Sequence, residues 1–131
     1  MFRIFALVFV FPLALSISAA EEAIPSLLGS WEGELIIGPD ASNLAFTFTE
    51  QDGQLRAALV SSAMGIFGMP AEEIELDGLR MEIRIPRIDG VFTGRIRLDE
   101  AGAKVIRIDG DWFQYAELLP ITLLPVDAPS F

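Results

Sequence analysis

The stretch LAFTFTEQDGQLRAALVS, residues 44–61, decides the fold class. Apolar side chains alternate with small or polar ones in each half, which is the two-residue period of a strand with one buried face. Asp52-Gly53 separates the halves and tolerates the positive φ that a tight turn requires. We therefore predict a β-hairpin here, with Phe46 and Phe48 on the same face of its first strand.

Alternation of this kind recurs along most of the remaining chain. The further runs are residues 29–35, 72–77, 79–85, 90–98, 104–108, 111–118 and 120–124. Turns are expected at Asp77-Gly78 and Asp109-Gly110, and Pro86 should end a strand because proline removes a ladder hydrogen bond. The exception is SSAMGIFGMPA, residues 61–71, which is apolar and broken by glycines and is expected to form a loop.

These runs give eight or nine short strands in hairpin order, and no stretch has convincing helical periodicity. The sequence thus predicts an all-β fold, an antiparallel up-and-down barrel of about eight strands. A β-sandwich is the alternative.

A large aromatic residue follows a glycine by two positions in three places. The three phrases are Gly29-Ser30-Trp31, Gly90-Val91-Phe92 and Gly110-Asp111-Trp112. Residues two apart share a face of a strand, so each ring should lie beside a glycine that leaves room for it. We expect these rings to fill the interior of the barrel, and direct contact with a ligand is the alternative.

The order of these phrases, from GSWEGEL at residue 29 to LPITL ending at residue 123, resembles a lipocalin-like β-barrel domain of exported bacterial proteins. The triplet GSW also resembles the G-x-W of lipocalins. The resemblance implies a barrel of about eight strands with an apolar interior, and no activity of its own. Such domains sometimes precede an α/β-hydrolase or serine-peptidase-like domain. This one is expected to stand alone, because the chain has no G-x-S-x-G or S-x-x-K phrase.

The chain is expected to divide into four parts. Residues 1–20 have a basic start, an apolar run too short to span a bilayer and small residues before Glu21, which together predict a cleaved signal peptide. Residues 21–28 are a lead-in, residues 29–124 the barrel domain, and residues 125–131 a flexible tail. The protein should therefore be exported, either to a periplasm or out of the cell, and it should not be an integral membrane protein.

Composition narrows the classes of function. The formal net charge of −10 argues against nucleic acid as a partner, because nucleic acid needs a basic surface. The chain has no His and no Cys, which removes His-based catalysis and nearly all zinc sites. We expect no catalytic residue, no metal and no cofactor, and we predict that the protein is not an enzyme.

The charged clusters have ordinary interpretations. Acids at residues 72–77 alternate with apolar residues, as on a solvated strand face. Asp109-Gly110-Asp111 lacks the ligand series of a calcium loop and fits a hairpin turn better. Arg80, Arg84, Arg95 and Arg97 should face outward on two strands, where an anion site is the less favoured alternative to pairing with acids.

Two functional hypotheses remain. The first is an exported, non-enzymatic module that binds a small apolar or amphipathic ligand inside the barrel. Its predicted ligand contacts are Phe46, Phe48, Met81 and Phe92 in the interior, with Met64, Phe67 and Met69 at the portal. The alternative is a filled barrel that acts as a protein-interaction or inhibitor module for an enzyme of the cell envelope.

Overall fold

The computed structural model describes residues 25–130, so the expected signal peptide, residues 1–20, lies outside this range. Within it the chain forms nine strands and two short 3₁₀ helices. The strands are β1 (Gly29–Ile37), β2 (Asp40–Gln51), β3 (Gln54–Ser61), β4 (Ile66–Pro70), β5 (Glu73–Asp77), β6 (Arg80–Ile85), β7 (Gly90–Leu98), β8 (Val105–Gln114) and β9 (Glu117–Val126). The 3₁₀ helices are η1 (Ser62–Met64) and η2 (Pro86–Ile88).

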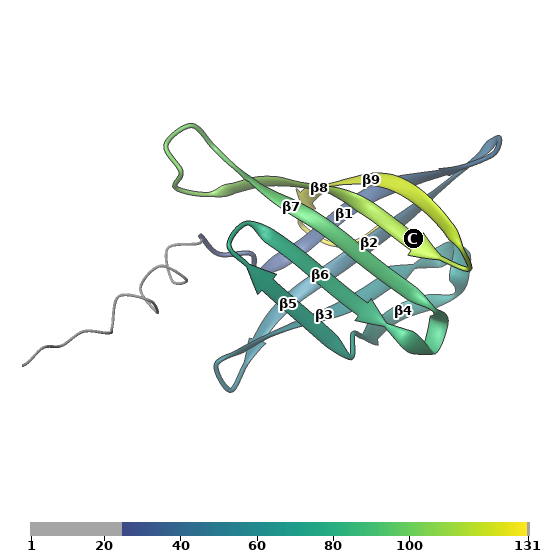
Figure 1. Ribbon diagram of the computed structural model, residues 1–131, viewed down its shortest axis with the longest axis horizontal. Helices are drawn as coiled ribbons and strands as arrows, with labels where there is room; N and C mark the ends of the chain where they lie inside the picture. The colour runs from purple at the N-terminus through teal and green to yellow at the C-terminus, as the bar shows by residue number, and fades with distance from the viewer. Residues whose placement is uncertain (1–24, 131) are drawn as a thin grey trace, which may run out of the picture.

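All nine strands belong to one antiparallel sheet with the order β4-β3-β2-β1-β9-β8-β7-β6-β5. Successive strands are neighbours throughout, except that β1 pairs with β9 and β4 does not pair with β5. The sheet curls into a half-barrel in which β5–β7 cross in front of β1–β3 (Figure 1). The all-β, up-and-down prediction is confirmed, and one continuous sheet replaces the two separate sheets of a sandwich.

The segment 61–71 differs from the expected loop. It forms η1 and then the edge strand β4, which pairs with β3 through a register shift between Leu59 and Val60. Alternation is lost in the sequence because the β-bulge and Gly68, at φ 120°, interrupt the regular side-chain period. This segment therefore supplies a strand, β4, where a loop was expected, and the total of nine strands lies within the expected eight or nine.

Two of the three predicted Asp-Gly turns are present. Asp52 and Gly53 both have positive φ between β2 and β3, and Gly78 has φ 63° between β5 and β6. The third prediction is wrong, because β8 runs straight through Asp109-Gly110. The chain instead reverses at Tyr115-Ala116, where both residues have positive φ without being glycine.

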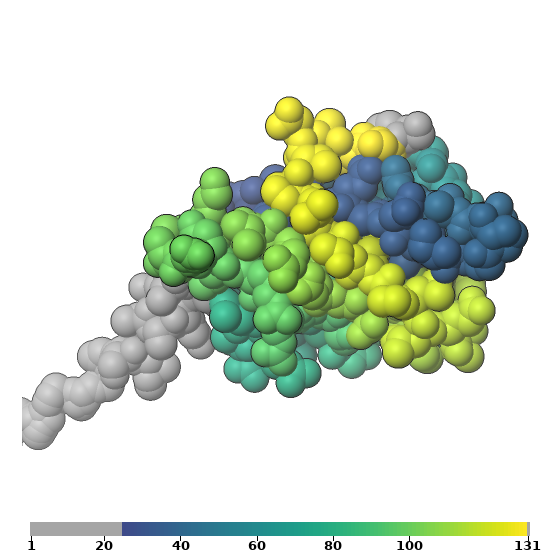
Figure 2. All heavy atoms as spheres, turned by 90° about the horizontal axis from the view of Figure 1, so that it is seen from above, coloured from purple at the N-terminus to yellow at the C-terminus, as the bar shows by residue number. Residues whose placement is uncertain are grey.

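The interior is filled by side chains. Trp31, Phe92 and Trp112 are all buried, as the glycine–aromatic phrases predict. The Phe46 ring centre lies 5.5 Å from that of Phe92 and 6.4 Å from that of Trp112. Rings from β2 and from β7 and β8 therefore meet in the core. Side chains of β9 and its neighbours close one wall over this core in a continuous surface (Figure 2).

Gly94 and Gly110 are directly opposite one another on β7 and β8. A Cβ on Gly94 would lie 2.7 Å from the Phe92 ring, and one on Gly110 would overlap the Thr93 carbonyl oxygen. Both positions therefore need glycine because of close packing, at a place where φ imposes no such need. The expectation that glycines make room for rings is confirmed here.

Residues at both ends of the barrel domain are tied to it. The Trp31 Nε1 donates a hydrogen bond to the Leu27 carbonyl oxygen at 2.8 Å, and Leu27 itself is buried. β9 continues to Val126, two residues beyond the expected end of the barrel, and the Ser130 amide donates to Glu32 Oε1 at 2.6 Å. Among residues 25–130 no helix has the length and apolar character to cross a membrane.

Candidate ligand-binding site

Four predicted ligand contacts lie together in the core. They are Phe46, Phe48, Met81 and Phe92, none of which is more than 2% exposed. Phe46 stacks on Phe48 at 6.3 Å and packs against Phe92, so these rings fill one another's space. None of the four lines the mouth pocket described below, and their role as ligand contacts stays a prediction.

The three predicted portal residues do not share one place. Met64 lies on η1, whereas Phe67 and Met69 lie on β4. Met64 and Met69 pack against the core, and Phe67 is 65% exposed. Of the three, Met64 lines a pocket at the mouth of the barrel.

This mouth pocket has a volume of about 200 Å³. Its walls come from the end of β1, the start of β2, η1 and the β8–β9 hairpin. Its lining includes Leu35, Ser61, Met64, Trp112, Gln114 and Leu119. An apolar cavity of ~150 Å³ is enough for a benzene-sized molecule. The pocket therefore fits a small ring or a short chain, and not a long lipid.

Gln114 holds the floor of the mouth pocket in place. Its Oε1 accepts a hydrogen bond from Trp112 Nε1 at 3.1 Å, and its Nε2 donates to the Ile88 carbonyl oxygen at 2.9 Å. Nε2 also lies 3.5 Å from the Met64 sulfur. These contacts connect β8, η2 and η1, so the orientation of the Trp112 ring is fixed before a ligand arrives.

Ser61 is the buried polar residue of the site. It is 2% exposed at the end of β3, shares the inward face with Leu59, and lines the mouth pocket. Its hydroxyl makes no hydrogen bond to any other residue within 25–130. A buried hydroxyl without a partner is costly, since it has given up its bonds to water. A polar atom of a ligand in the pocket would restore that bond.

Tyr115 and Glu117 form the rim beside Trp112 and Gln114. Both are exposed, and the Tyr115 amide donates to Asp89 Oδ2 at 3.2 Å, which ties the β8–β9 turn to the end of η2. The pocket is otherwise lined by uncharged residues. These residues offer apolar surface and one or two hydrogen-bonding groups, and among them there is no nucleophile–base pair.

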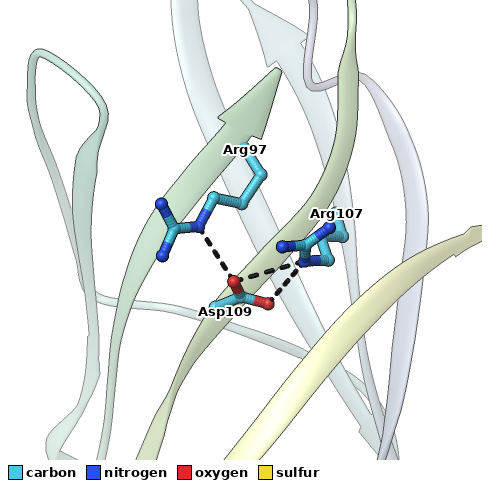
Figure 3. Close-up of polar contacts among 3 residues, drawn as sticks. All are labelled: Arg97, Arg107 and Asp109. Carbon is cyan, nitrogen blue, oxygen red and sulfur yellow. Dashed lines mark hydrogen bonds and ion pairs between the residues drawn. The ribbon is translucent and has the colours of Figure 1, made fainter. Parts of the chain in front are cut away.

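A separate charged hollow lies on the outer face of β5–β8. Arg97 Nε donates to Asp109 Oδ2 at 2.9 Å, and Arg107 Nε to Oδ1 at 3.0 Å (Figure 3). The Arg97 hydrogen bond has the largest effect on the pKa of Asp109 and lowers it. Burial, the next largest effect, raises this pKa, and the Arg107 hydrogen bond and the charges of both arginines lower it further, so the net shift is downward. In the described part of the chain, no three acidic side chains gather as ligands for a metal ion.

The outward arginines mostly pair with acids. Arg84 contacts Glu73 and Glu82, and Arg97 contacts Asp109, as surface pairs. Arg80 and Arg95 are cross-strand partners on β6 and β7, which places two positive charges side by side. They line the same hollow as five carboxylate residues, so the hollow as a whole is acidic and does not favour an anion.

Sequence reasoning missed Ser61, Trp112 and Gln114 as site residues. Trp112 was expected to be a core residue, with ligand contact as the alternative, and it lines the pocket. Ser61 stands in an alternating run at an inward position, a place usually taken by an apolar residue, and this was the one available signal. Nothing local marks Gln114, two of whose three partners lie 26 and 50 residues away.

Comparison with protein-family models, with curated proteins and with solved structures finds no match to this chain. The resemblance to a lipocalin-like domain therefore stays a prediction.

Proposed function

We propose that the protein is an exported, non-enzymatic module that holds a small amphipathic molecule in the mouth pocket. The observation that carries this proposal is the Ser61 hydroxyl, which has no hydrogen-bond partner within residues 25–130 and is buried in a pocket whose other walls are mainly apolar. Exposed apolar side chains alone are common on protein surfaces. A buried polar group that faces a pocket and has no partner is uncommon, and it suits a ligand with a matching polar atom.

The walls define the ligand class. Leu35, Met64 and Trp112 provide apolar surface, and each Å² of ligand they cover contributes about 25 cal/mol. The ligand needs one hydroxyl or carbonyl group for Ser61. Glu117 at the rim would repel an acidic group on the ligand, so the polar head of the ligand should be neutral or cationic.

Benzyl alcohol is a suitable first probe, because it joins a benzene-sized ring to one hydroxyl. Its binding can be followed by NMR of the two indole N–H groups in ¹⁵N-labelled protein. The Trp112 signal should shift on titration. The Trp31 signal should not, because its N–H is bonded to the Leu27 carbonyl oxygen and Trp31 does not line the pocket. Trp31 thus serves as an internal control.

Two comparisons make this test specific. Toluene has the same ring without the hydroxyl. It should bind the original protein several-fold more weakly than benzyl alcohol does, whereas the two probes should bind a Ser61→Ala variant equally well. Ala63→Leu, which adds bulk at an exposed lining position, should block both probes. Equal shifts of Trp31 and Trp112, or no shift of either, would contradict the proposal.

The protein-interaction hypothesis is the second candidate, and an exposed apolar row favours it. Val91, Phe113 and Leu118 are cross-strand neighbours on β7, β8 and β9, and the last two are exposed. Exposed apolar groups in one row suit contact with another protein. Under this hypothesis, replacing Phe113 and Leu118 by serine would abolish association with an envelope enzyme and leave benzyl alcohol binding unchanged.

A further inference from the structure

The half-barrel has a seam between β3 and β5. Residues 66–77 pair first with β3, as β4, and then with β6, as β5. The change of partner occurs between two consecutive amides. The Ala71 N–H donates to the Ala57 carbonyl oxygen at 2.9 Å, and the Glu72 N–H donates to the Arg84 carbonyl oxygen at 3.0 Å.

Beyond this crossing the two edges separate. β5 and the start of β3 diverge toward their hairpins at the left of Figure 1. Between them lies a cleft of about 540 Å³, lined by residues 54–56 and 71–76. Among the described residues no backbone hydrogen bond joins β3 to β5, so both edges of this cleft are unpaired strand edges.

The direction of the free backbone groups follows from the hairpins. Gln51 pairs with Gln54, and Asp77 with Arg80, across two-residue turns, so each is a hydrogen-bonded pair. Because bonding direction alternates along a strand, the N–H and C=O groups of Leu55, on β3, point into the cleft. By the same alternation those of Ile74 and Leu76, on β5, point into it from the other side. Such rows are templates for an added strand.

Side chains at the cleft specify what such a strand must look like. Ile74 packs against the core, and Leu76, on the same face, is exposed. Glu73, Glu75 and Asp77 occupy the opposite, outer face. Glu73 lies near Arg84, whereas Glu75 and Asp77 have no ion pair within residues 25–130. An added strand needs apolar residues facing inward and basic residues facing outward.

A second copy of this chain does not meet that requirement. Pairing of β5 with another β5 would place Glu75 and its acidic neighbours opposite the same acidic row. Like charges directly opposite one another are destabilising. The acidic edge therefore disfavours self-association and favours a basic partner strand.

We propose that the cleft between β3 and β5 binds an extended segment of a partner protein, with alternating apolar and basic residues, as an added strand on β5. Main-chain hydrogen bonds to Ile74 and Leu76 supply the pairing. Glu75 and Asp77 select basic side chains on the outer face. This site lies beside Gln54 at the start of β3, whereas the mouth pocket lies at Ser61 at its end, so the two proposals are independent.

The test uses a labelled peptide of about seven alternating valine and lysine residues, the length of a strand. Fluorescence anisotropy measures its binding, and amide hydrogen exchange reports Ile74 and Leu76 in the complex. We expect binding together with slower exchange at both amides. The same peptide with N-methyl groups on alternate residues keeps its side chains, cannot pair through its backbone, and should not bind.

Charge reversal provides the second measurement. Replacing Glu75 and Asp77 by lysine should weaken binding of the lysine peptide several-fold and strengthen binding of a valine–glutamate peptide similarly, because opposite charges across the strands become like charges and the reverse. Unchanged Trp31 and Trp112 indole signals verify that the variant is folded. The proposal is overturned if the lysine peptide does not bind, if the N-methylated peptide binds equally well, or if charge reversal leaves the preference unchanged.

Discussion

The close packing around Gly94 gives a sharp test of how the sheet is held together. Gly94→Ala places a methyl group 2.7 Å from the Phe92 ring and 2.8 Å from an Ile108 methyl group. Both contacts are with side chains in a fully buried core. The Phe92 ring has little space to move away, because the centre of the Phe46 ring lies 5.5 Å from its own.

Overpacking of this kind costs about 1–3 kcal/mol. At roughly 4 °C per kcal/mol for a domain near 100 residues, Tm should fall by about 4–12 °C. The loss is a net value, because Gly→Ala also removes freedom from the unfolded chain and by itself would stabilise the protein by about 0.4–1 kcal/mol.

Urea unfolding of a double-mutant cycle tests the reasoning. Phe92→Leu alone should cost about 1–2 kcal/mol from lost burial. It also vacates the space that the new methyl group needs, so Gly94→Ala with Phe92→Leu should cost less than the sum of the two. Gly110→Ala is the matched control. Its methyl group would lie 2.8 Å from the Phe92 ring but would also overlap the Thr93 carbonyl oxygen, which belongs to the backbone. Phe92→Leu removes only the first of these contacts, so it should not restore the stability of Gly110→Ala.

Additive free energies in the Gly94 cycle would refute this explanation. So would a Gly94→Ala protein as stable as the original chain. Rescue of Gly110→Ala by Phe92→Leu would show that the ring, and not the backbone of β7, restricts that position.

Two further predictions concern single polar groups. Ser61→Ala should leave stability unchanged or raise it by up to about 1 kcal/mol in urea unfolding, because it removes a buried hydroxyl that has no partner among residues 25–130. A clear loss of stability would show that the hydroxyl is bonded. Asp109→Asn should cost at most about 1 kcal/mol at neutral pH, since the ion pairs are partly exposed. The pKa of Asp109 is lowered on folding from its ordinary value of 3.8, so its contribution is present above that value and is lost as pH falls through the folded pKa. Unfolding curves of the two proteins should therefore converge at acid pH, and a difference independent of pH would contradict the role of the carboxylate.

The Asp-Gly dipeptides show how far the fold could be predicted from the sequence. Those at residues 52–53 and 77–78 lie between strands, as their local chemistry indicates. The third dipeptide, Asp109-Gly110, has the same sequence and lies inside β8, because Gly110 faces the Thr93 carbonyl oxygen of a neighbouring strand. That requirement comes from a residue 17 positions away and leaves no local mark. In the same way, tertiary pairing of β8 with β9 imposes positive φ on Tyr115 and Ala116.

The candidate site was predicted in part, for a similar reason. Met64 stood out as a flexible apolar residue in an irregular segment, and it lines the mouth pocket. Ser61 gains its importance from the absence of a hydrogen-bond partner among the described residues, and Gln114 from partners on two other elements. These are properties of the folded arrangement, and local alternation carries no information about them.

The pairing of β1 with β9 has a consequence for the order in which the chain folds. Ser30 lies opposite Val126, so the contact that unites the two halves of the sheet joins residues almost a whole domain apart. A circular permutant that links these ends and opens the chain between Ala71 and Glu72 would turn every strand pairing into a local hairpin or a short connection. Folding rate rises as the mean sequence separation of contacts falls. Such a permutant should keep the same sheet and reach it faster than the natural chain.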